Sequence, residues 1–280
     1  MKSKWFFPKF APYEKPYEKT GILIKNKILS IRTKYQKLEI LDSYLYGKVL
    51  VLDGIIQTAE KGEFFYHEML VNLPLIYHGN VESVLIIGGG DGGALKEVLK
   101  HTVKEVHMAE IDGKVIEMSR KYLPSVSKSA FDDKRTKLFV GDGIEFVKKF
   151  KDYFDAVIID LTDPSGPSQF LFSPKFYRSI FLALKKDGIV ITQSGSFPSQ
   201  TEEINMVKEN MKQVFPFVKT HLGLVPQYGI GLFSYTIGSK KSLNVDMKTV
   251  KKRFEKLKID TKYYTPEIHL ASGALPKLLK

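Results

Sequence analysis

The stretch Val84-Leu85-Ile86-Ile87-Gly88-Gly89-Gly90-Asp91-Gly92-Gly93 decides the fold, because an apolar run leads directly into an acidic, glycine-rich turn. Further along, a second apolar run, Ala156-Val157-Ile158-Ile159, leads into Asp160-Leu161-Thr162-Asp163-Pro164. In a doubly wound sheet both turns lie at the carboxyl ends of neighbouring strands, where such folds bind their ligands. The pair therefore predicts a nucleoside-binding α/β fold, and carboxylates gathered at that edge anticipate a cationic substrate.

Strand and helix patterns alternate through most of the chain, which predicts parallel strands joined by helical crossovers in a Rossmann-like, mostly parallel sheet. Two late runs, 218–222 and 232–237, have no long helix between them and predict an antiparallel hairpin at one edge. Pro266 predicts the start of a short helix. The predicted strands are 84–87, 105–109, 137–140, 156–160 and 189–192, and the helices that follow them are 94–100, 114–122, 144–150, 176–184 and 202–214.

The first part of the chain has a different pattern. Between Gly21 and Ala59 short apolar runs are separated by turn residues, which is typical of antiparallel hairpins. We predict a small N-terminal β domain over residues 1–62 and a nucleoside-binding catalytic domain over 63–280, beginning with a helix that ends at Gly79. The residues predicted to form turns between the N-terminal strands are Asn26, Asp42-Ser43, Gly47 and Asp53-Gly54.

Composition limits the class of protein. The 280 residues, 43% hydrophobic and 26% charged, are sufficient for a sizeable core. No apolar run approaches the roughly 20 residues that cross a bilayer, and the first residues lack a signal-peptide pattern, so we expect a cytoplasmic protein with no membrane partner. The absence of cysteine excludes disulfides and thiolate metal sites, and we predict neither a metal site nor a tightly bound cofactor.

The net charge of +12 raises the possibility of a nucleic-acid partner, because a basic surface attracts phosphate. The lysines are spread over separate segments, however, and solvated surfaces explain them better. We therefore predict no nucleic-acid partner. The lysine groups are 25/27, 148/149/151, 185/186, 240/241 and 248/251/252.

The glycine turn specifies the cofactor class more closely. Gly88, Gly90 and Gly93 fit G-x-G-x-x-G, and Glu110 lies where a ribose-binding acid belongs. This geometry serves nicotinamide dinucleotides and S-adenosylmethionine-type nucleosides equally. A carboxylate at Asp91 would repel a pyrophosphate and attract a sulfonium or amine, so we favour a sulfonium nucleoside over the dinucleotide of a nicotinamide dehydrogenase.

Further polar residues follow the third and fourth predicted strands. Asp142, between two glycines, is suited either to hydrogen-bond an adenine amine or to cap a helix, and we favour ligand contact. Asp160 should project into the crevice at the sheet edge. Asp163 alone could be a turn former before Pro164, but that does not explain the pair. The segment 164–174 is suited to fold over the site as a lid.

Two carboxylates suit a reaction in which an alkylamine attacks a carbon bonded to a sulfonium sulfur. The attacking nitrogen must be neutral, and deprotonating an alkylammonium at pH 7 costs roughly 4 to 5 kcal/mol. One aspartate can hold the amine while the other accepts its proton, and such general-base assistance is worth about 10² to 10⁴ in rate.

These residues resemble the polyamine aminopropyltransferases, the spermidine synthase family, over nearly the whole chain. Members of that family transfer aminopropyl from decarboxylated S-adenosylmethionine to an amine and release methylthioadenosine. The motifs that carry the resemblance are 52–57 (LDGIIQ), 63–70 (EFFYHEML), 88–93 (GGGDGG), 110–112 (EID), 141–143 (GDG), 160–167 (DLTDPSGP), 171–172 (LF) and 266–276.

The resemblance implies roles for individual residues. Asp160 would be the proton acceptor, and Asp91 would hold the aminopropyl ammonium and select the decarboxylated donor by charge. Without the resemblance, His67 would be interpreted as a structural histidine and Gln36 as an ordinary strand residue. The implied donor-binding residues are Gln36, Asp91, Glu110, Asp142, Gly143 and Pro167, and the implied amine-binding residues are Tyr66, His67, Asp91, Asp160, Asp163 and Tyr228.

Two positions depart from the family pattern. Gly62 stands where many relatives have aspartate, and Leu222 with the segment 225–231 replaces the usual Tyr and Ile-Pro-Thr-Tyr-Pro-Ser-Gly. These departures leave the acceptor open among a putrescine-like diamine, agmatine and a longer polyamine.

Other functions are weighed against this one. An RNA methyltransferase of the same fold would explain the basic charge, but the Asn/Asp-Pro-Pro-Tyr tetrapeptide that many amino-methylating enzymes carry is absent. A polyamine-binding relative without catalysis is disfavoured because both aspartates are present. Unpaired strand edges in the β domain, preceded by Trp5-Phe6-Phe7, predict a homodimer or a homotetramer.

Overall fold

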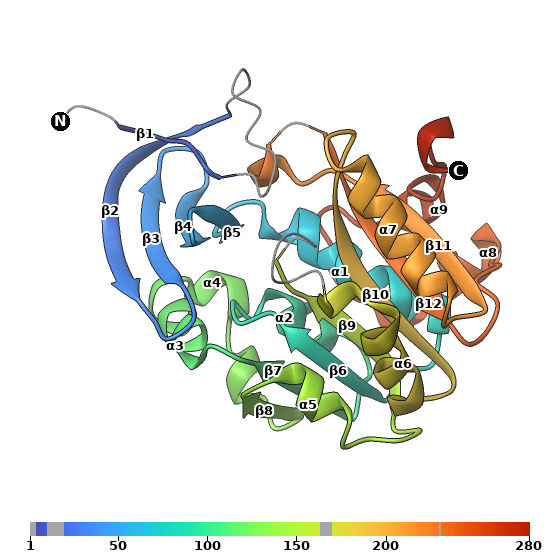
Figure 1. Ribbon diagram of the computed structural model, residues 1–280. Helices are drawn as coiled ribbons and strands as arrows, with labels where there is room; N and C mark the ends of the chain where they lie inside the picture. The colour runs from blue at the N-terminus through green and yellow to red at the C-terminus, as the bar shows by residue number, and fades with distance from the viewer. Residues whose placement is uncertain (1–3, 10–19, 163–169, 230) are drawn as a thin grey trace.

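The computed structural model describes residues 4–9, 20–162, 170–229 and 231–280. Within these residues the chain forms a five-stranded antiparallel sheet followed by a seven-stranded, mostly parallel sheet with helices on both faces (Figure 1). The predicted fold class, a Rossmann-like sheet preceded by a small antiparallel β domain, is therefore confirmed.

The small sheet is a meander in which each strand pairs with the next. The predicted turn at Asn26 is wrong, because one strand continues through that position and absorbs the irregularity as register shifts between Ile24 and Asn26 and between Lys27 and Leu29. Strand β3 likewise includes Asp42 and Ser43. The strands are β1 (Lys4–Phe6), β2 (Ile22–Arg32), β3 (Lys37–Ser43), β4 (Gly47–Leu52) and β5 (Ile55–Ala59).

The large sheet has the strand order β11-β12-β10-β9-β6-β7-β8. The pairs from β10 to β8 are parallel, and the predicted antiparallel hairpin forms one edge as β11 and β12. The strands are β6 (Ser83–Gly88), β7 (Glu105–Glu110), β8 (Thr136–Val140), β9 (Phe154–Asp160), β10 (Leu184–Phe197), β11 (Phe217–Gly223) and β12 (Leu232–Ser239).

Helices cover both faces because the central strands are apolar on both sides. Val84 and Ile86 of β6 belong to a buried cluster with side chains of α1, α2 and α8, whereas Leu85 and Ile87 belong to one with side chains of α5, α6 and α7. Helix α8 was not predicted. Its sequence is rich in lysine, which obscures the amphipathic pattern, and of its residues only Val250 is buried. The helices are α1 (Glu63–His78), α2 (Gly93–Leu99), α3 (Gly113–Tyr122), α4 (Pro124–Ser127), α5 (Gly143–Val147), α6 (Pro174–Ala183), α7 (Thr201–Lys212), α8 (Met247–Leu257) and α9 (Pro266–Ala271), with 3₁₀ turns η1 (Ala130–Asp132), η3 (Pro226–Tyr228) and η4 (Lys277–Leu279).

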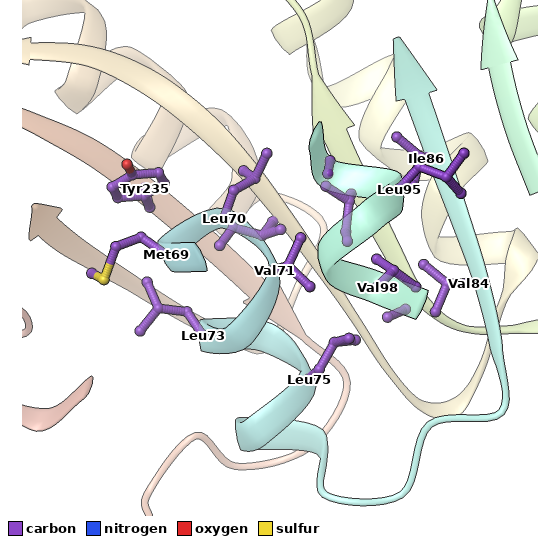
Figure 2. Packing of buried hydrophobic residues seen from close by; sticks show 14 of the residues in the cluster. Met69, Leu70, Val71, Leu73, Leu75, Val84, Ile86, Leu95, Val98 and Tyr235 are labelled. Atoms are coloured by element: carbon purple, nitrogen blue, oxygen red, sulfur yellow. The ribbon is translucent and has the colours of Figure 1, made fainter. Parts of the chain in front are cut away.

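Helix α1 is buried along most of its length, and its buried residues are mostly apolar. Figure 2 shows Leu70 and Val71 of α1 in the same cluster as Leu95 of α2 and Ile86 of β6. The helix ends, as predicted, where Gly79 adopts the left-handed conformation. Because α1 leads out of the small sheet and into this core, its first turns are held firmly at the boundary between the two sheets.

A second contact fixes the small sheet against the large domain. Leu38, Ile40 and Leu50 pack on the apolar side chains of α3 and α4, which lie beside β3 in Figure 1. The carboxyl ends of the parallel strands therefore face strands of the small sheet. No helix in the described parts of the chain is long and apolar enough to span a bilayer.

A cluster of buried neutral histidines gives the fold an acid-sensitive site. His221 is fully buried, and its ring nitrogens contact the Tyr77 hydroxyl at 3.2 Å and the Ser272 hydroxyl at 2.8 Å. Burial lowers the pKa of His221 well below its usual value, helped by the nearby His269 and Lys219, and burial lowers the pKa of His269 to about 3. Both side chains are therefore neutral in the folded protein at pH 5.

We expect acid to destabilise the protein through these histidines. The unfolded chain binds a proton at each histidine below about pH 6.5 while the folded chain does not, so the free energy of unfolding falls by about 1.4 kcal/mol per pH unit for each residue. Urea unfolding of the wild type and His221→Gln at pH 6.5 and 5 should show a smaller fall in the variant, by about 2 kcal/mol. Parallel curves between pH 8 and 7 are the control, and equal falls below pH 6.5 would contradict the assignment.

Candidate active site

A cavity of about 370 Å³ lies between the carboxyl ends of the parallel strands and the small sheet. This volume is within the range of small-molecule sites. Both sheets contribute to its walls, the small sheet mainly with apolar side chains and the large one with polar residues. The small sheet provides Gln36, Leu50, Leu52, Ile55, Ile56 and Gln57, and the large domain provides, among others, Tyr66, Gly89, Gly90, Asp91, Glu110, Asp160, Leu161, Gln193, Gln227, Tyr228 and Phe233.

The glycine turn between β6 and α2 is closed tightly against its neighbours. Gly88 has φ +85°, and a Cβ there would overlap the carbonyl oxygen of Asp160. A Cβ at Gly93 would overlap the ring of His67. Only glycine permits both approaches. The turn therefore places Asp91 between the ends of two strands and the first turns of α1.

Glu110, at the end of β7, is held by backbone amides. Its carboxylate accepts hydrogen bonds from the Gly90 nitrogen at 3.1 Å and the Asp112 nitrogen at 2.8 Å. Burial, together with the nearby carboxylates of Asp112 and Asp160, raises the pKa of Glu110 to about 7 despite these two bonds. Such a carboxylate is ready to accept hydrogen bonds from hydroxyl groups of a bound sugar.

Gln36 reaches this region from the small sheet. Its side-chain amide donates to Asp112 at 3.1 Å, and the Thr33 hydroxyl donates to the same carboxylate oxygen at 2.7 Å. The other Asp112 oxygen caps α3 by accepting from the Lys114 nitrogen at 3.1 Å. Asp112 was not predicted as a site residue, although it follows Glu110 closely in the sequence. It orients Gln36 at the cavity wall.

Asp142 and Gly143 lie next to this region rather than in the cavity wall. The Asp142 side chain accepts a hydrogen bond from the Ile144 nitrogen at 2.8 Å, so it caps α5. The cap occupies one carboxylate oxygen and leaves the other for a ligand. The structure therefore shows the helix cap, which was the alternative interpretation of Asp142. Contact between Asp142 and a ligand remains a prediction.

Asp160 ends β9 as predicted and is almost enclosed. One carboxylate oxygen accepts from the Tyr66 hydroxyl at 2.8 Å, and the other finds no hydrogen-bond partner among the described residues. Burial and the nearby Asp91 raise the pKa of Asp160 to about 6, although His67 and Tyr66 act in the opposite direction. A carboxylate with a free oxygen and a raised pKa can accept a proton from a bound amine.

Asp91 is positioned by a chain of buried charges. Its carboxylate accepts from the Gly93 nitrogen at 2.6 Å and lies 3.5 Å from Nε2 of His67. Nδ1 of His67 lies 2.7 Å from Glu63, which in turn forms an ion pair with Lys96. Burial alone would lower the pKa of His67, but Asp91 and Glu63 raise it to about 10. His67 therefore lies behind Asp91 as a buried cation and does not line the cavity.

We expect Glu63→Gln to lower the pKa of His67 by at least one unit. Glu63 is one of two carboxylates that hold the proton on this ring, and an amide supplies no charge. NMR titration of protein labelled with ¹³C-histidine measures this pKa directly, and His67→Gln identifies the signal. A signal that still titrates near pH 10 in Glu63→Gln would contradict the role of Glu63.

An aromatic wall leads away from Asp160. Tyr66 packs against Tyr228 and Phe233 with ring centroids 5.7 and 5.8 Å apart. The Tyr228 hydroxyl donates to the backbone oxygen of Gln57 in the small sheet. Such a surface suits the alkyl chain of an amine, and its electron-rich faces also favour a cation.

Two groups of residues remain: predicted residues that lie outside the described parts of the chain, and cavity residues that were not predicted. Asp163, Pro167 and most of the predicted lid, 164–174, lie outside the described residues. Gln193, within β10, and Gln227, within η3, line the cavity but were missed because neither belongs to a recognisable motif. The signal that could have identified Gln227 is its place beside Tyr228, which the sequence does single out.

The parallel sheet, the glycine turn and the acidic cavity at the strand ends are together typical of a nucleoside-binding enzyme. The sequence matches the family described as "Spermine/spermidine synthase domain" over residues 63–249 and the "Spermidine synthase tetramerisation domain" over residues 5–60. The chain therefore belongs to the spermine/spermidine synthase family and is a transferase of that family. This confirms the resemblance stated from the sequence, and the comparisons give the methyltransferase alternative no support.

Individual relatives agree with this assignment. The polyamine aminopropyltransferase of Thermoanaerobacter pseudethanolicus (strain ATCC 33223 / 39E) is 46% identical over 263 residues, covering 93% of this chain and 92% of that protein. The spermidine synthase from Thermotoga maritima is 37% identical with a TM-score of 0.90, covering 100% of this chain and 95% of that one. A spermidine synthase in complex with the transition state analogue AdoDATO is 38% identical with a TM-score of 0.91, covering 99% and 94%.

Proposed function

We propose that this protein transfers the aminopropyl group of decarboxylated S-adenosylmethionine to an amine and releases methylthioadenosine. The observation that carries the proposal is the pair of carboxylates, Asp91 and Asp160, which line one cavity at the ends of the adjacent strands β6 and β9. His67 is a buried cation beside Asp91, and two further carboxylates, Asp160 and Glu110, line the same cavity, so the site favours cationic ligands. The sulfonium donor and an alkylamine acceptor supply those charges.

The donor is proposed to lie along the ends of β6 and β7. Glu110, with Gln36 beside it, would bind the ribose hydroxyls, and Asp142 and Gly143 the adenine. Asp91 would hold the ammonium at the end of the aminopropyl group. Pro167 is also assigned to donor binding, and Asp163 to the amine, but both lie outside the described residues and rest on the resemblance alone.

Asp160 is proposed as the proton acceptor. The acceptor amine binds as an ammonium, and one of its protons moves to the free oxygen of Asp160. The neutral nitrogen then attacks the carbon bonded to the sulfonium sulfur, the carbon–nitrogen bond forms, and the carbon–sulfur electrons leave with neutral methylthioadenosine. Tyr66 orients the Asp160 carboxylate through its hydroxyl. His67 holds Asp91 from behind rather than contacting the amine.

The acceptor is proposed to be a linear diamine, agmatine or a longer polyamine. Its alkyl chain would lie along Tyr66, Tyr228 and Phe233. We also propose a homo-oligomer assembled through the small sheet, because the residues that form this sheet match a tetramerisation domain. The choice between dimer and tetramer, the absence of a nucleic-acid partner and the cytoplasmic location stay predictions.

Mass spectrometry tests the proposal directly. The protein is incubated with decarboxylated or ordinary S-adenosylmethionine and a panel of amines, and methylthioadenosine and new amines are measured. We expect methylthioadenosine only with the decarboxylated donor, in amounts equal to the new amine. No product with any amine, together with S-adenosylhomocysteine formed from the ordinary donor and RNA, would overturn the proposal in favour of a methyltransferase.

A further inference from the structure

Gln227 is a buried polar side chain of the cavity that the reaction described above leaves without a role. It lies in the 3₁₀ turn η3 (Pro226–Tyr228), is only 3% exposed and lines the cavity. Neither its carboxamide oxygen nor its nitrogen has a hydrogen-bond partner in the described part of the chain. A buried amide without partners costs stability, which indicates a ligand that supplies them.

The turn that carries Gln227 is fixed on both sides. The Tyr46 hydroxyl donates to the Pro226 oxygen at 3.0 Å, and the Tyr228 hydroxyl donates to the Gln57 oxygen. These two bonds tie η3 to the small sheet. The carboxamide packs over Gly62, where a Cβ would lie 3.4 Å from its oxygen. Because Gly62 has no side chain, that position supplies the carboxamide with no side-chain hydrogen-bond partner.

Charge is distributed unevenly around the cavity. Among the described lining residues the acidic ones are Asp91, Glu110 and Asp160, and all three lie at or just after the ends of strands of the parallel sheet. Gln227 instead adjoins Tyr228, whose ring packs on Tyr66. The cavity therefore offers carboxylates for the reacting nitrogen, an aromatic wall, and a neutral hydrogen-bonding group at the turn that adjoins that wall.

We propose that Gln227 determines acceptor specificity by accepting a hydrogen bond from the far nitrogen of the acceptor amine. This rests on the proposed aminopropyl transfer. The near nitrogen lies at Asp160, the carbon chain lies along Tyr66 and Tyr228, and the carboxamide oxygen receives an N–H of the far nitrogen. The amide nitrogen can donate to a water that the same substrate encloses. The substrate class is an amine with a second, N–H-bearing nitrogen, in preference to a monoamine.

A paired substrate test isolates this contact. The wild type and Gln227→Met, which keeps the side-chain length but removes both polar atoms, are assayed with the best linear diamine and with the n-alkylamine of the same carbon number. We expect kcat/KM for the diamine to fall by roughly 10- to 100-fold in the variant and that for the monoamine to stay within a factor of about two. An equal fall for both amines would mean that Gln227 has a structural role only.

Stability gives an independent readout. Since the amide lacks partners in the described part of the free protein, Gln227→Met should leave Tm unchanged or raise it. Thr58→Val is the matched control, because the Thr58 hydroxyl is also buried without a partner in the described chain but does not line the cavity. It should leave the diamine preference unchanged. A loss of preference in Thr58→Val equal to that in Gln227→Met would overturn the assignment.

The outcomes for Gln227 are distinct from those for the enzyme as a whole. If the proposed aminopropyl transfer is wrong, the wild type forms no methylthioadenosine with any amine. If only the role of Gln227 is wrong, the wild type is active and its preference for the diamine over the monoamine survives in Gln227→Met.

Discussion

Asp160→Asn is expected to lower kcat by roughly 10²- to 10⁴-fold, the range of general-base assistance. The amide oxygen can still accept the hydrogen bond from the Tyr66 hydroxyl, which is 2.8 Å from the carboxylate, so the local geometry should persist. What the substitution removes is the oxygen that is proposed to take the proton. The dissociation constant of the decarboxylated donor, measured by calorimetry, should change by less than about threefold, because the residues proposed to hold the donor are Asp91 and Glu110.

The pH profile provides a second measurement on the same variant. Because the pKa of Asp160 is raised to about 6, the carboxyl group loses its proton as the pH rises through 6, and wild-type kcat should rise over that interval. An amide side chain cannot titrate there, so this limb should be absent from the variant. Tyr66→Phe is the matched control: it removes the orienting hydroxyl but keeps the base, and its kcat should fall by only about tenfold. Near-normal turnover in Asp160→Asn would exclude Asp160 as the proton acceptor.

Asp91→Asn is expected to abolish most of the discrimination between the decarboxylated donor and ordinary S-adenosylmethionine. Asp91 faces the proposed aminopropyl ammonium with a negative charge, and the carboxylate of the ordinary donor would be repelled there. Asparagine keeps an oxygen for the Gly93 nitrogen, 2.6 Å away, so the turn should retain its shape. The affinity for the decarboxylated donor should fall by roughly 10- to 100-fold.

Calorimetric titration with both donors measures this change. The ratio of the two dissociation constants should shrink by at least about tenfold, because binding of the ordinary donor should improve or stay constant. The matched control is Asp132→Asn, an acid whose side chain is 68% exposed and paired with Arg120, which should alter neither constant. Equal weakening of both donors would mean that Asp91 supports the turn and does not select by charge.

Much of the large domain could be predicted from the sequence because its signals are local. The apolar run before Gly88 and the run before Asp160 each form a buried strand, and a strand buried on both faces needs no distant information to be recognised. The helix that begins at Glu63 and ends at Gly79 was equally clear. Asp91, Glu110 and Asp160 line the cavity because each lies at or just after the end of a parallel strand.

The small sheet and the C-terminal region were less predictable because their signals depend on packing. Asn26 is a turn former by composition, yet it lies inside β2, where register shifts accommodate it. The short strand β1 exists only because β2 offers an edge for Lys4–Phe6. Helix α8 is rich in lysine in the sequence, and it is attached to the core by the buried side chain of Val250.

By itself the sequence determined the fold class, the family and the acids at the strand ends, since each is specified by residues that are close together along the chain. The tertiary structure decided how those residues work. The bond from Tyr66 to Asp160, the placement of His67 behind Asp91 and the approach of Gln36 to Asp112 each join segments that are far apart in sequence. It also showed that Gln227 is buried at the cavity without partners in the described chain. These properties arise from burial and from the docking of one sheet on the other, which no local pattern encodes.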